Sequence, residues 1–216
     1  MTEQQRTRRS YDAVADAYAG AIGDELRHKP FDRALLEVLV ETSGDGTVGD
    51  VGCGPGHVAA HLRGRGARVV AVDLSPRMAA HALASGTPTA AADLTALPFG
   101  DDALAGLVCF YAIFHLDDAG RDAAYAEMAR VLRPGGLAVI AFHTGDAESP
   151  TGTERRLHEW WDHDVDLTFR FLSPDTEEAA LDRAGLCREA RLDRQPGEGE
   201  HPSERSYLVV RAAPVP

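Results

Sequence analysis

A glycine-rich turn between two apolar segments constrains the fold of this chain more than any other feature. Its residues are Val48-Gly49-Asp50-Val51-Gly52-Cys53-Gly54-Pro55-Gly56-His57. We expect a strand to run into this turn and a helix to leave it, which is the context in which a glycine loop holds a ligand. Glycine lets the backbone approach a ligand closely, and the start of a helix offers free N–H groups. The segment therefore predicts a ligand site between a strand and a helix.

The spacing of the glycines distinguishes between the candidate ligands. A dinucleotide fingerprint reads GxGxxG, but here the glycines are Gly52, Gly54 and Gly56, and His57 occupies the fingerprint's third glycine position. A phosphate loop needs Lys followed by Ser or Thr after its glycines, whereas the only lysine of the chain is Lys29. A nicotinamide oxidoreductase and a phosphate-loop protein are therefore disfavoured. A tight strand–helix turn without a ligand is the remaining alternative.

Apolar segments alternate with amphipathic ones along the chain, which is typical of a mostly parallel sheet with helices on both faces. Strands are predicted at residues 47–51, 68–73, 88–92, 105–110, 137–142, 187–192 and 206–210. Helices are predicted at residues 8–19, 31–41, 57–65, 76–84, 119–132 and 175–184. The alternation breaks only in residues 145–172, which we interpret as an insertion beside the active site. The fold class is α/β, with a Rossmann-like, seven-stranded sheet.

The charge balance argues against polyanionic partners. The chain has 34 acidic and 22 basic residues, a formal charge of −12. Binding a polyanion relies on Lys and Arg that displace counterions from phosphates. Nucleic acids and membranes are therefore not expected as partners, and a small-molecule substrate is.

The cysteines and the N-terminus indicate a reducing compartment. Cys53, Cys109 and Cys187 lie far apart, and their odd number argues against a disulfide scaffold. No apolar stretch follows the first charges, so no signal peptide is expected, and no apolar run reaches the roughly 18 residues that span a bilayer. We expect a cytoplasmic protein, either a monomer or a homodimer.

The glycine turn and several later segments together resemble a known family. The order of an acid, any residue and Gly-x-Gly-x-Gly at residues 50–56 is similar to motif I of class I S-adenosylmethionine (SAM)-dependent methyltransferases. The other segments that resemble the family's motifs, in the family's order, are residues 69–75, 92–99, 107–116 and 130–136. Tyr11 and Tyr18 resemble residues of the N-terminal helix that covers the cofactor. The resemblance spans roughly residues 11–143 and is closest to the small-molecule group that includes ubiquinone/menaquinone-biosynthesis methyltransferases.

The resemblance implies SAM as cofactor and S-adenosylhomocysteine as product. It assigns the methionine end of the cofactor to Asp50, Gly52, Cys53 and Gly54. Phe110 would contribute backbone near the cofactor's amino group. The resemblance also implies that the last of the seven strands is antiparallel.

The nucleoside end of the cofactor falls on the next two motifs. Asp73 lies 21 positions after Gly52 and would hold the two ribose hydroxyls. Leu74 and Met78 would pack on the nucleoside, or simply belong to the core. Asp93 would accept a hydrogen bond from the adenine amino group, with Leu94 beside it.

Two histidines are candidates for the catalytic base. Methyl transfer is an in-line displacement in which the protein positions the nucleophile and removes its proton. We favour His143, because it follows the fifth strand at the carboxyl edge of the sheet, where such folds bind ligands. His115, after the fourth strand, is the second candidate. Either histidine could instead serve only to complete hydrogen bonds in its loop.

The insertion carries the candidate substrate contacts. Trp160 and Trp161 suit the wall of a pocket for an aromatic or cationic substrate, or anchor the insertion on the sheet. His163 and Arg170 lie in the same segment, and Arg205 and Tyr207, at the last strand, are further candidates. On a helix His158 and His163 would be about 140° apart, so a zinc site is not expected and we predict no metal.

We expect one methyltransferase domain. Cap helices would occupy residues 1–45, the cofactor-binding core 46–144, the insertion 145–172 and the strands completing the sheet 173–216. The function predicted is SAM-dependent methyl transfer to an O, N or C atom of a small molecule. The alternatives are a SAM-binding protein of this fold that catalyses a non-methylating reaction and, less favoured, a nucleic-acid methyltransferase, which would need a basic face or an Asn-Pro-Pro-Tyr type of motif after the fourth strand.

Overall fold

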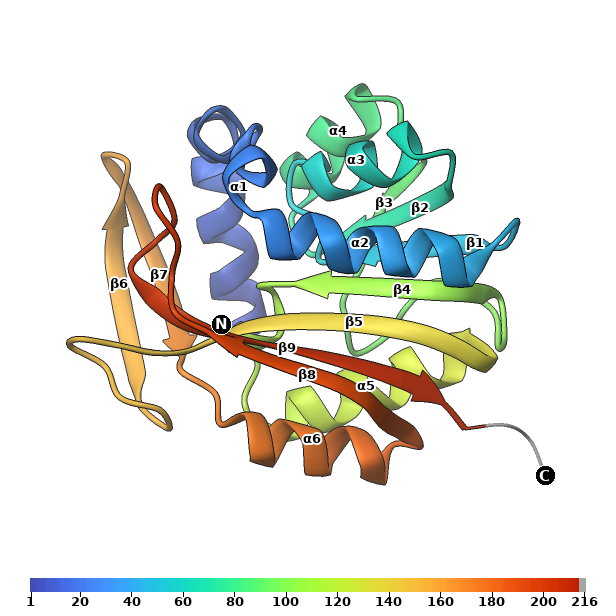
Figure 1. Cartoon of the computed structure of the whole chain (residues 1–216). Helices are drawn as coiled ribbons and strands as arrows, with labels where there is room; N and C mark the ends of the chain where they lie inside the picture. Colours follow the sequence, from blue (N-terminus) through green and yellow to red (C-terminus); the bar gives the residue numbers. More distant parts are fainter. Residues whose placement is uncertain (214–216) are drawn as a thin grey trace.

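A seven-stranded sheet forms the centre of the molecule (Figure 1). The computed structural model describes residues 1–213, and the sheet order is β3-β2-β1-β4-β5-β9-β8. The strands are β1 (Thr47–Val51), β2 (Arg68–Asp73), β3 (Thr89–Ala91), β4 (Leu104–Phe110), β5 (Leu132–Asp146), β8 (Leu186–Arg194) and β9 (Ser203–Ala212). The first five are parallel, and β9 pairs antiparallel with both β5 and β8. The predicted α/β fold with seven strands and an antiparallel last strand is confirmed.

Helices cover both faces of this sheet. Figure 1 shows α2 (Pro30–Ser43), α3 (His57–Gly64) and α4 (Pro76–Ala84) on one side, and α5 (Asp118–Val131) and α6 (Pro174–Arg183) on the other. Successive residues of β4 point to opposite faces: Leu107 and Cys109 join the core under α5 and α6, while Val108 packs with the core under α2 and α3. Ser75 caps α4 and Ser173 caps α6, each followed by proline at the first helical position.

Several elements are longer than predicted, α1 and β5 most of all. Helix α1 spans Glu3–Ile22 rather than residues 8–19, because Thr2 and Gln5 form a capping box at its start. Strand β5 begins at Leu132 rather than at residue 137. The Arg-Pro-Gly-Gly segment does end α5, but it continues as extended chain, and a register shift opposite β4 accommodates it. No helix among residues 1–213 has the length and apolar character needed to cross a membrane.

The 145–172 segment folds as a β-hairpin beside the main sheet. Strands β6 (Glu154–Trp160) and β7 (His163–Arg170) pair with each other, and β7 packs on α1. The helical geometry that we used to compare His158 with His163 is therefore wrong for this segment. Trp161 and Asp162 form the two-residue turn, with φ values of 48° and 60°, so the right-handed strand twist is matched without the usual glycine. The hairpin and α1 lie at the edge of the sheet where the parallel strands have their carboxyl ends (Figure 1).

Candidate active site

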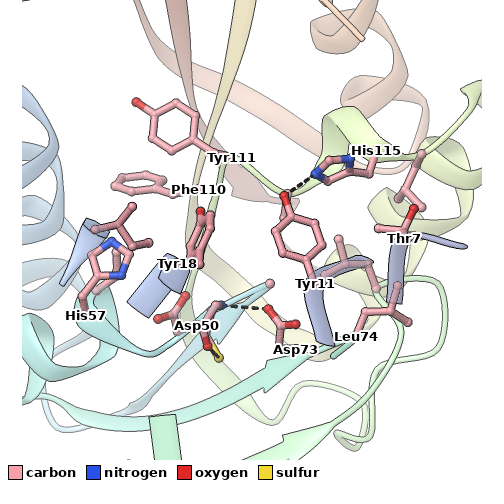
Figure 2. A pocket seen from close by; sticks show the side chains of 18 of the residues that line it. Thr7, Tyr11, Tyr18, Asp50, His57, Asp73, Leu74, Phe110, Tyr111 and His115 are labelled. Atoms are coloured by element: carbon pink, nitrogen blue, oxygen red, sulfur yellow. Dashed lines mark hydrogen bonds between the residues drawn. The ribbon is translucent and has the colours of Figure 1, made fainter. Parts of the chain in front are cut away.

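The glycine turn lies at the carboxyl end of β1 and lines a cavity of about 100 Å³ (Figure 2). Gly52, Gly54 and Gly56 have φ values of 74°, 53° and 88°, which favour glycine. A Cβ on Gly52 would lie 2.4 Å from Cβ of Ala112, so the chain passes there too closely for a side chain. The N–H of Gly52 donates to the Val72 carbonyl of β2. The turn is thus held against β2 with its backbone facing the cavity.

Asp73 ends β2 and lines the same cavity. Its Oδ2 accepts from the N–H of Gly54 and its Oδ1 from the N–H of Ser75, both at 2.8 Å. Burial raises the pKa of this carboxyl to about 6. The two backbone bonds fix the orientation of the carboxylate while each oxygen keeps a lone pair for a further donor.

Asp50 is the second carboxyl of this cavity, and one of its two oxygens lacks a partner. Its side chain comes from β1 and is 2% exposed, and Oδ2 has no hydrogen bond within residues 1–213. Burial, together with the charge of Asp73, raises the pKa of Asp50 to about 7. A buried carboxylate without a partner is unfavourable unless a donor or cation reaches it. The position therefore fits the ammonium group of an amino-acid ligand, as in SAM.

The N-terminal helix closes over this cavity. Tyr11 and Tyr18 of α1 point into it, as Figure 2 shows, with Tyr18 edge-on to Tyr11 at 5.8 Å between ring centroids. The Tyr11 hydroxyl bonds Nε2 of His115 at 2.7 Å, and Nδ1 of His115 bonds the Thr168 carbonyl at 3.0 Å. A carbonyl only accepts, so Nδ1 carries the proton and Tyr11 donates to Nε2.

These hydrogen bonds bear on whether His115 can act as the catalytic base. Burial lowers its pKa to about 4, so the ring is neutral near pH 7. Both ring nitrogens are already occupied, by Tyr11 and by the hairpin strand β7. The structure therefore places His115 as a residue that joins α1 to the hairpin, without a free nitrogen for a substrate proton.

A second cavity of about 520 Å³ lies between the hairpin, α1 and β9. Five residues line both cavities: Tyr11, Tyr18, Ile22, Glu25 and Tyr111. The two cavities therefore adjoin at these side chains. A volume of this size accommodates a small organic molecule.

His143 of β5 lines the second cavity. Its Nδ1 bonds Ser203 Oγ at 2.7 Å, and Ser203 Oγ is 3.1 Å from Nδ1 of His201. Its ring stacks on Tyr111 at 4.9 Å, and Nε2 has no hydrogen-bond partner among the described residues. Burial and the charge of Arg205 lower the pKa of His143, so it is neutral near pH 7. A neutral ring with one free nitrogen can accept a proton.

The other predicted cofactor residues divide between the cavity and the core. Five of them line the first cavity: Cys53, Leu74, Asp93, Leu94 and Phe110. Asp93 also accepts from the N–H and hydroxyl of Thr95. Met78 is 1% exposed and is not among the lining residues, so its position agrees with the core alternative.

Of the predicted substrate contacts, some line the second cavity and others do not. Trp160, Trp161 and Arg170 line the second cavity. His163 lies exposed next to the hairpin turn, away from either lining, and that position argues against a substrate contact. Tyr207 is buried behind Tyr111, and the two hydroxyls are 2.9 Å apart. Tyr207 thus supports a lining residue and does not itself line the cavity.

Arg205, a further predicted substrate contact, also lines the second cavity. Sequence reasoning missed other lining residues: Glu25, Lys29, Tyr111 and His201, which come from three separate segments of the chain. The one local signal was the four-residue spacing of Glu25 and Lys29, which form an ion pair at 2.9 Å. Tyr111 has a φ of 54°, an uncommon conformation for a non-glycine residue at the end of a strand.

Comparisons with known proteins agree with this geometry. A family model described as a methyltransferase domain matches residues 49–140. An uncharacterized methyltransferase of Mycobacterium sp. (strain JLS) is 36% identical over 143 residues, which cover 65% of this chain and 52% of the relative. A malonyl-acyl-carrier protein O-methyltransferase of Pseudescherichia vulneris is 33% identical over 172 residues, covering 76% of this chain and 65% of that protein. This chain spans about half the length of the mycobacterial relative.

A solved structure with a different printed activity shares the fold. The structure of a (4+2)-cyclase, SpnF, has a TM-score of 0.72 and 18% sequence identity, covering 100% of this chain and 98% of that one. The fold and the cavity define a Rossmann-like cofactor-binding domain. Together with the family model and the two relatives, they show that the chain belongs to the class I SAM-dependent methyltransferase family.

Proposed function

We propose that this chain transfers the methyl group of SAM to an O, N or C atom of a small molecule and releases S-adenosylhomocysteine. The observation that carries the proposal is the unpartnered, buried Oδ2 of Asp50, in a cavity that adjoins a second, larger one. A buried acid without a partner indicates a missing cation, and the second cavity offers space for an acceptor. The lining is rich in aromatic side chains, which favours an apolar metabolite as that acceptor.

The first cavity would hold the cofactor through three carboxyls. Asp50 would pair with the ammonium group, beside the backbone of the glycine turn. Asp73 would accept from the ribose hydroxyls, because its orientation is fixed by two backbone donors. Asp93 and Leu94 lie on the same lining and would contact the adenine. This order along the sheet edge follows the order of β1, β2 and β3.

When bound, SAM supplies an electrophilic methyl group for in-line displacement. Tyr11, Tyr18 and Tyr111 lie where the two cavities adjoin, so they would orient the acceptor and exclude water from it. His143 would take the proton of an O–H or N–H acceptor on Nε2. In that tautomer Nδ1 donates to Ser203, whose hydroxyl can donate in turn to His201.

Transfer of a labelled methyl group tests this function. The purified chain is incubated with methyl-labelled SAM and an extract of the cells that produce it, and the label is followed into separated small-molecule and nucleic-acid fractions. We expect the label in a small molecule. Label in nucleic acid would instead identify a nucleic-acid methyltransferase. Bound SAM with no transfer to either fraction would favour the non-methylating alternative.

A further inference from the structure

The second cavity has an aromatic wall. Trp160 and Trp161 of the hairpin stack on each other at 4.5 Å, with 9° between their planes. Tyr18 of α1 meets both of them edge-on at 5.5 and 5.7 Å. Phe169 of β7 lies edge-on to Trp160 at 6.0 Å. These four side chains present flat apolar surface, which suits a planar or aromatic ligand.

Another part of the same lining is cationic. It surrounds the ring of Tyr111: Lys29 Nζ lies 4.6 Å from the ring centroid, Arg205 Cζ 5.9 Å, and the His143 ring 4.9 Å. His201 follows, 5.7 Å from His143. We refer to Lys29 and Arg205 as the cationic end; burial lowers the pKa of His143 and His201 beside them.

The lining has more basic than acidic residues, although the whole chain has a charge of −12. Its Lys and Arg residues are Lys29, Arg155, Arg170 and Arg205, and its acids are Glu25 and Glu200. Acids from outside the lining pair with two of the arginines: Asp146 with Arg155, and Glu3 and Glu154 with Arg170. These pairs leave Lys29 and Arg205 as the basic residues that face the two acids of the lining itself, Glu25 and Glu200.

Each of the two acids beside the cationic end contacts two basic side chains. Glu25 contacts both Lys29 and the His57 ring, at 2.9 and 3.0 Å. Glu200 contacts Arg194 through both oxygens and Arg205 through one, at 2.9 Å. Lys29 has three N–H donors and a single ion-pair partner, so donors remain for a ligand.

Arg205 is incompletely satisfied. It is 1% exposed, its Nη2 donates to the His201 carbonyl, and its Nε has no hydrogen-bond partner within residues 1–213. Nη1 lies near Glu200 without hydrogen-bond geometry. A buried guanidinium is costly unless an anion compensates it. Glu200 already lies 2.9 Å from Nη1, and because Arg205 lines the cavity, its unpaired Nε–H leaves a further donor for a ligand.

We propose that the second cavity binds a planar apolar carboxylic acid, with its ring system against Trp160, Trp161 and Tyr18 and its carboxylate at Lys29 and Arg205. The inference rests on the proposed function, because it makes this acid the class of methyl acceptor. The carboxylate accepts from the N–H donors that Lys29 and Arg205 have left over from Glu25 and Glu200, and the aromatic wall contacts the apolar body. The lone lysine of the chain thereby acts as a specificity residue.

The chain contains its own reporter for this cavity. Both of its tryptophans, Trp160 and Trp161, line the cavity, so intrinsic tryptophan fluorescence reports on its occupancy. The probes are 4-biphenylacetate and its neutral amide, which have the same shape and differ in charge. Each is titrated into the full chain saturated with S-adenosylhomocysteine, whose own binding is measured first by calorimetry.

We expect the acid to bind at least about ten-fold more tightly than the amide, because charge-assisted hydrogen bonds form only with the acid. Lys29→Gln should reduce this preference to about three-fold or less, since the ligand loses a fully charged partner. Lys29→Arg should retain most of it. Arg183→Gln, on the exposed face of α6, is the matched control and should leave the preference unchanged.

Two results would overturn the proposal: equal affinities of acid and amide in the wild type, or the same preference in Lys29→Gln as in the wild type. Arg205→Gln gives an independent check, with circular dichroism to confirm folding. Failure of S-adenosylhomocysteine to bind would contradict the proposed function, and it would leave the acid preference to be measured on the unliganded chain. Calorimetry with S-adenosylhomocysteine therefore tests the proposed function, and the preference for the acid over the amide tests the substrate class.

Discussion

Tyr11 donates a 2.7 Å hydrogen bond to Nε2 of His115, and this bond joins the first helix to the loop after β4. Through its other nitrogen, His115 holds the Thr168 carbonyl of the hairpin. One imidazole thus connects three segments that are far apart in the chain. All three segments lie beside the first cavity, so their connection determines how firmly that cavity is closed.

Replacing Tyr11 by Phe should lower the free energy of unfolding by about 1–3 kcal/mol, because Nε2 of His115 loses its donor in a buried place. It should also weaken SAM binding by about three- to ten-fold, because α1 closes the cavity less firmly. Chemical denaturation and calorimetry measure the two effects. For stability, Tyr18→Phe is the matched control, since the Tyr18 hydroxyl makes no hydrogen bond to any described residue. Equal stabilities of the two variants would refute the role of this bond.

His115 should make stability depend on pH. Its folded pKa, about 4, is below the unfolded value of about 6.5. The unfolded state therefore binds the proton more readily between these values. The stability linked to His115 is complete above about pH 6.5 and falls as the pH decreases toward 4, by about 3 kcal/mol in total. In His115→Gln, urea unfolding followed from pH 7 to pH 4 should show a smaller decline than the wild type. An unchanged decline would contradict the assignment.

Asp73→Ala should weaken SAM binding by about ten-fold or more, because the ribose hydroxyls lose a buried acceptor. The variant also loses the acceptor of the Gly54 and Ser75 amides, so we expect the glycine turn to be destabilised as well. Asp73→Asn keeps one acceptor oxygen and should be intermediate. Calorimetry on the three proteins tests this order, and unchanged affinity in the alanine variant would remove Asp73 from the cofactor site.

His143→Ala should retain SAM affinity and lower turnover by about 10²-fold or more, as expected for loss of a general base. Ser203→Ala should give a smaller loss, because it removes only the partner of Nδ1. His158→Ala, on the exposed side of β6, is the matched control. Steady-state kinetics with the acceptor identified from the labelling experiment provide the measurement. Wild-type turnover in His143→Ala would show that His143 is not the base.

The sheet and the cofactor cavity could be predicted because their signals are local. Buried parallel strands are short apolar runs, and Asp50, the glycines and Asp73 lie at strand ends whose order the alternation of elements defines. The turn of the hairpin could not be predicted in the same way. Trp161 and Asp162 adopt positive φ without an Asn-Gly or Asp-Gly signal.

The second cavity could be predicted only in part. Trp160, Trp161, Arg170, Arg205 and His143 were expected near a substrate, and all five line it. The cationic end could not be foreseen, because Lys29 and Arg205 are far apart in the chain and meet only when β9 inserts between β5 and β8. The partners of His115 could not be foreseen for the same reason: Thr168 lies in a segment whose fold the sequence pattern left open.

The affinity of the chain for SAM as a function of pH, in the wild type and in Asp50→Asn, tests whether Asp50 holds the ammonium group of the cofactor. Ionised Asp50 should pair with the cofactor's ammonium, and its pKa is about 7. Wild-type affinity should therefore rise about five- to ten-fold from about pH 6 to about pH 7.5. Asp50→Asn should bind at least about ten-fold more weakly at pH 7.5 and show a smaller rise. Equal affinity of the two proteins at every pH, or no binding by the folded wild type, would contradict the account.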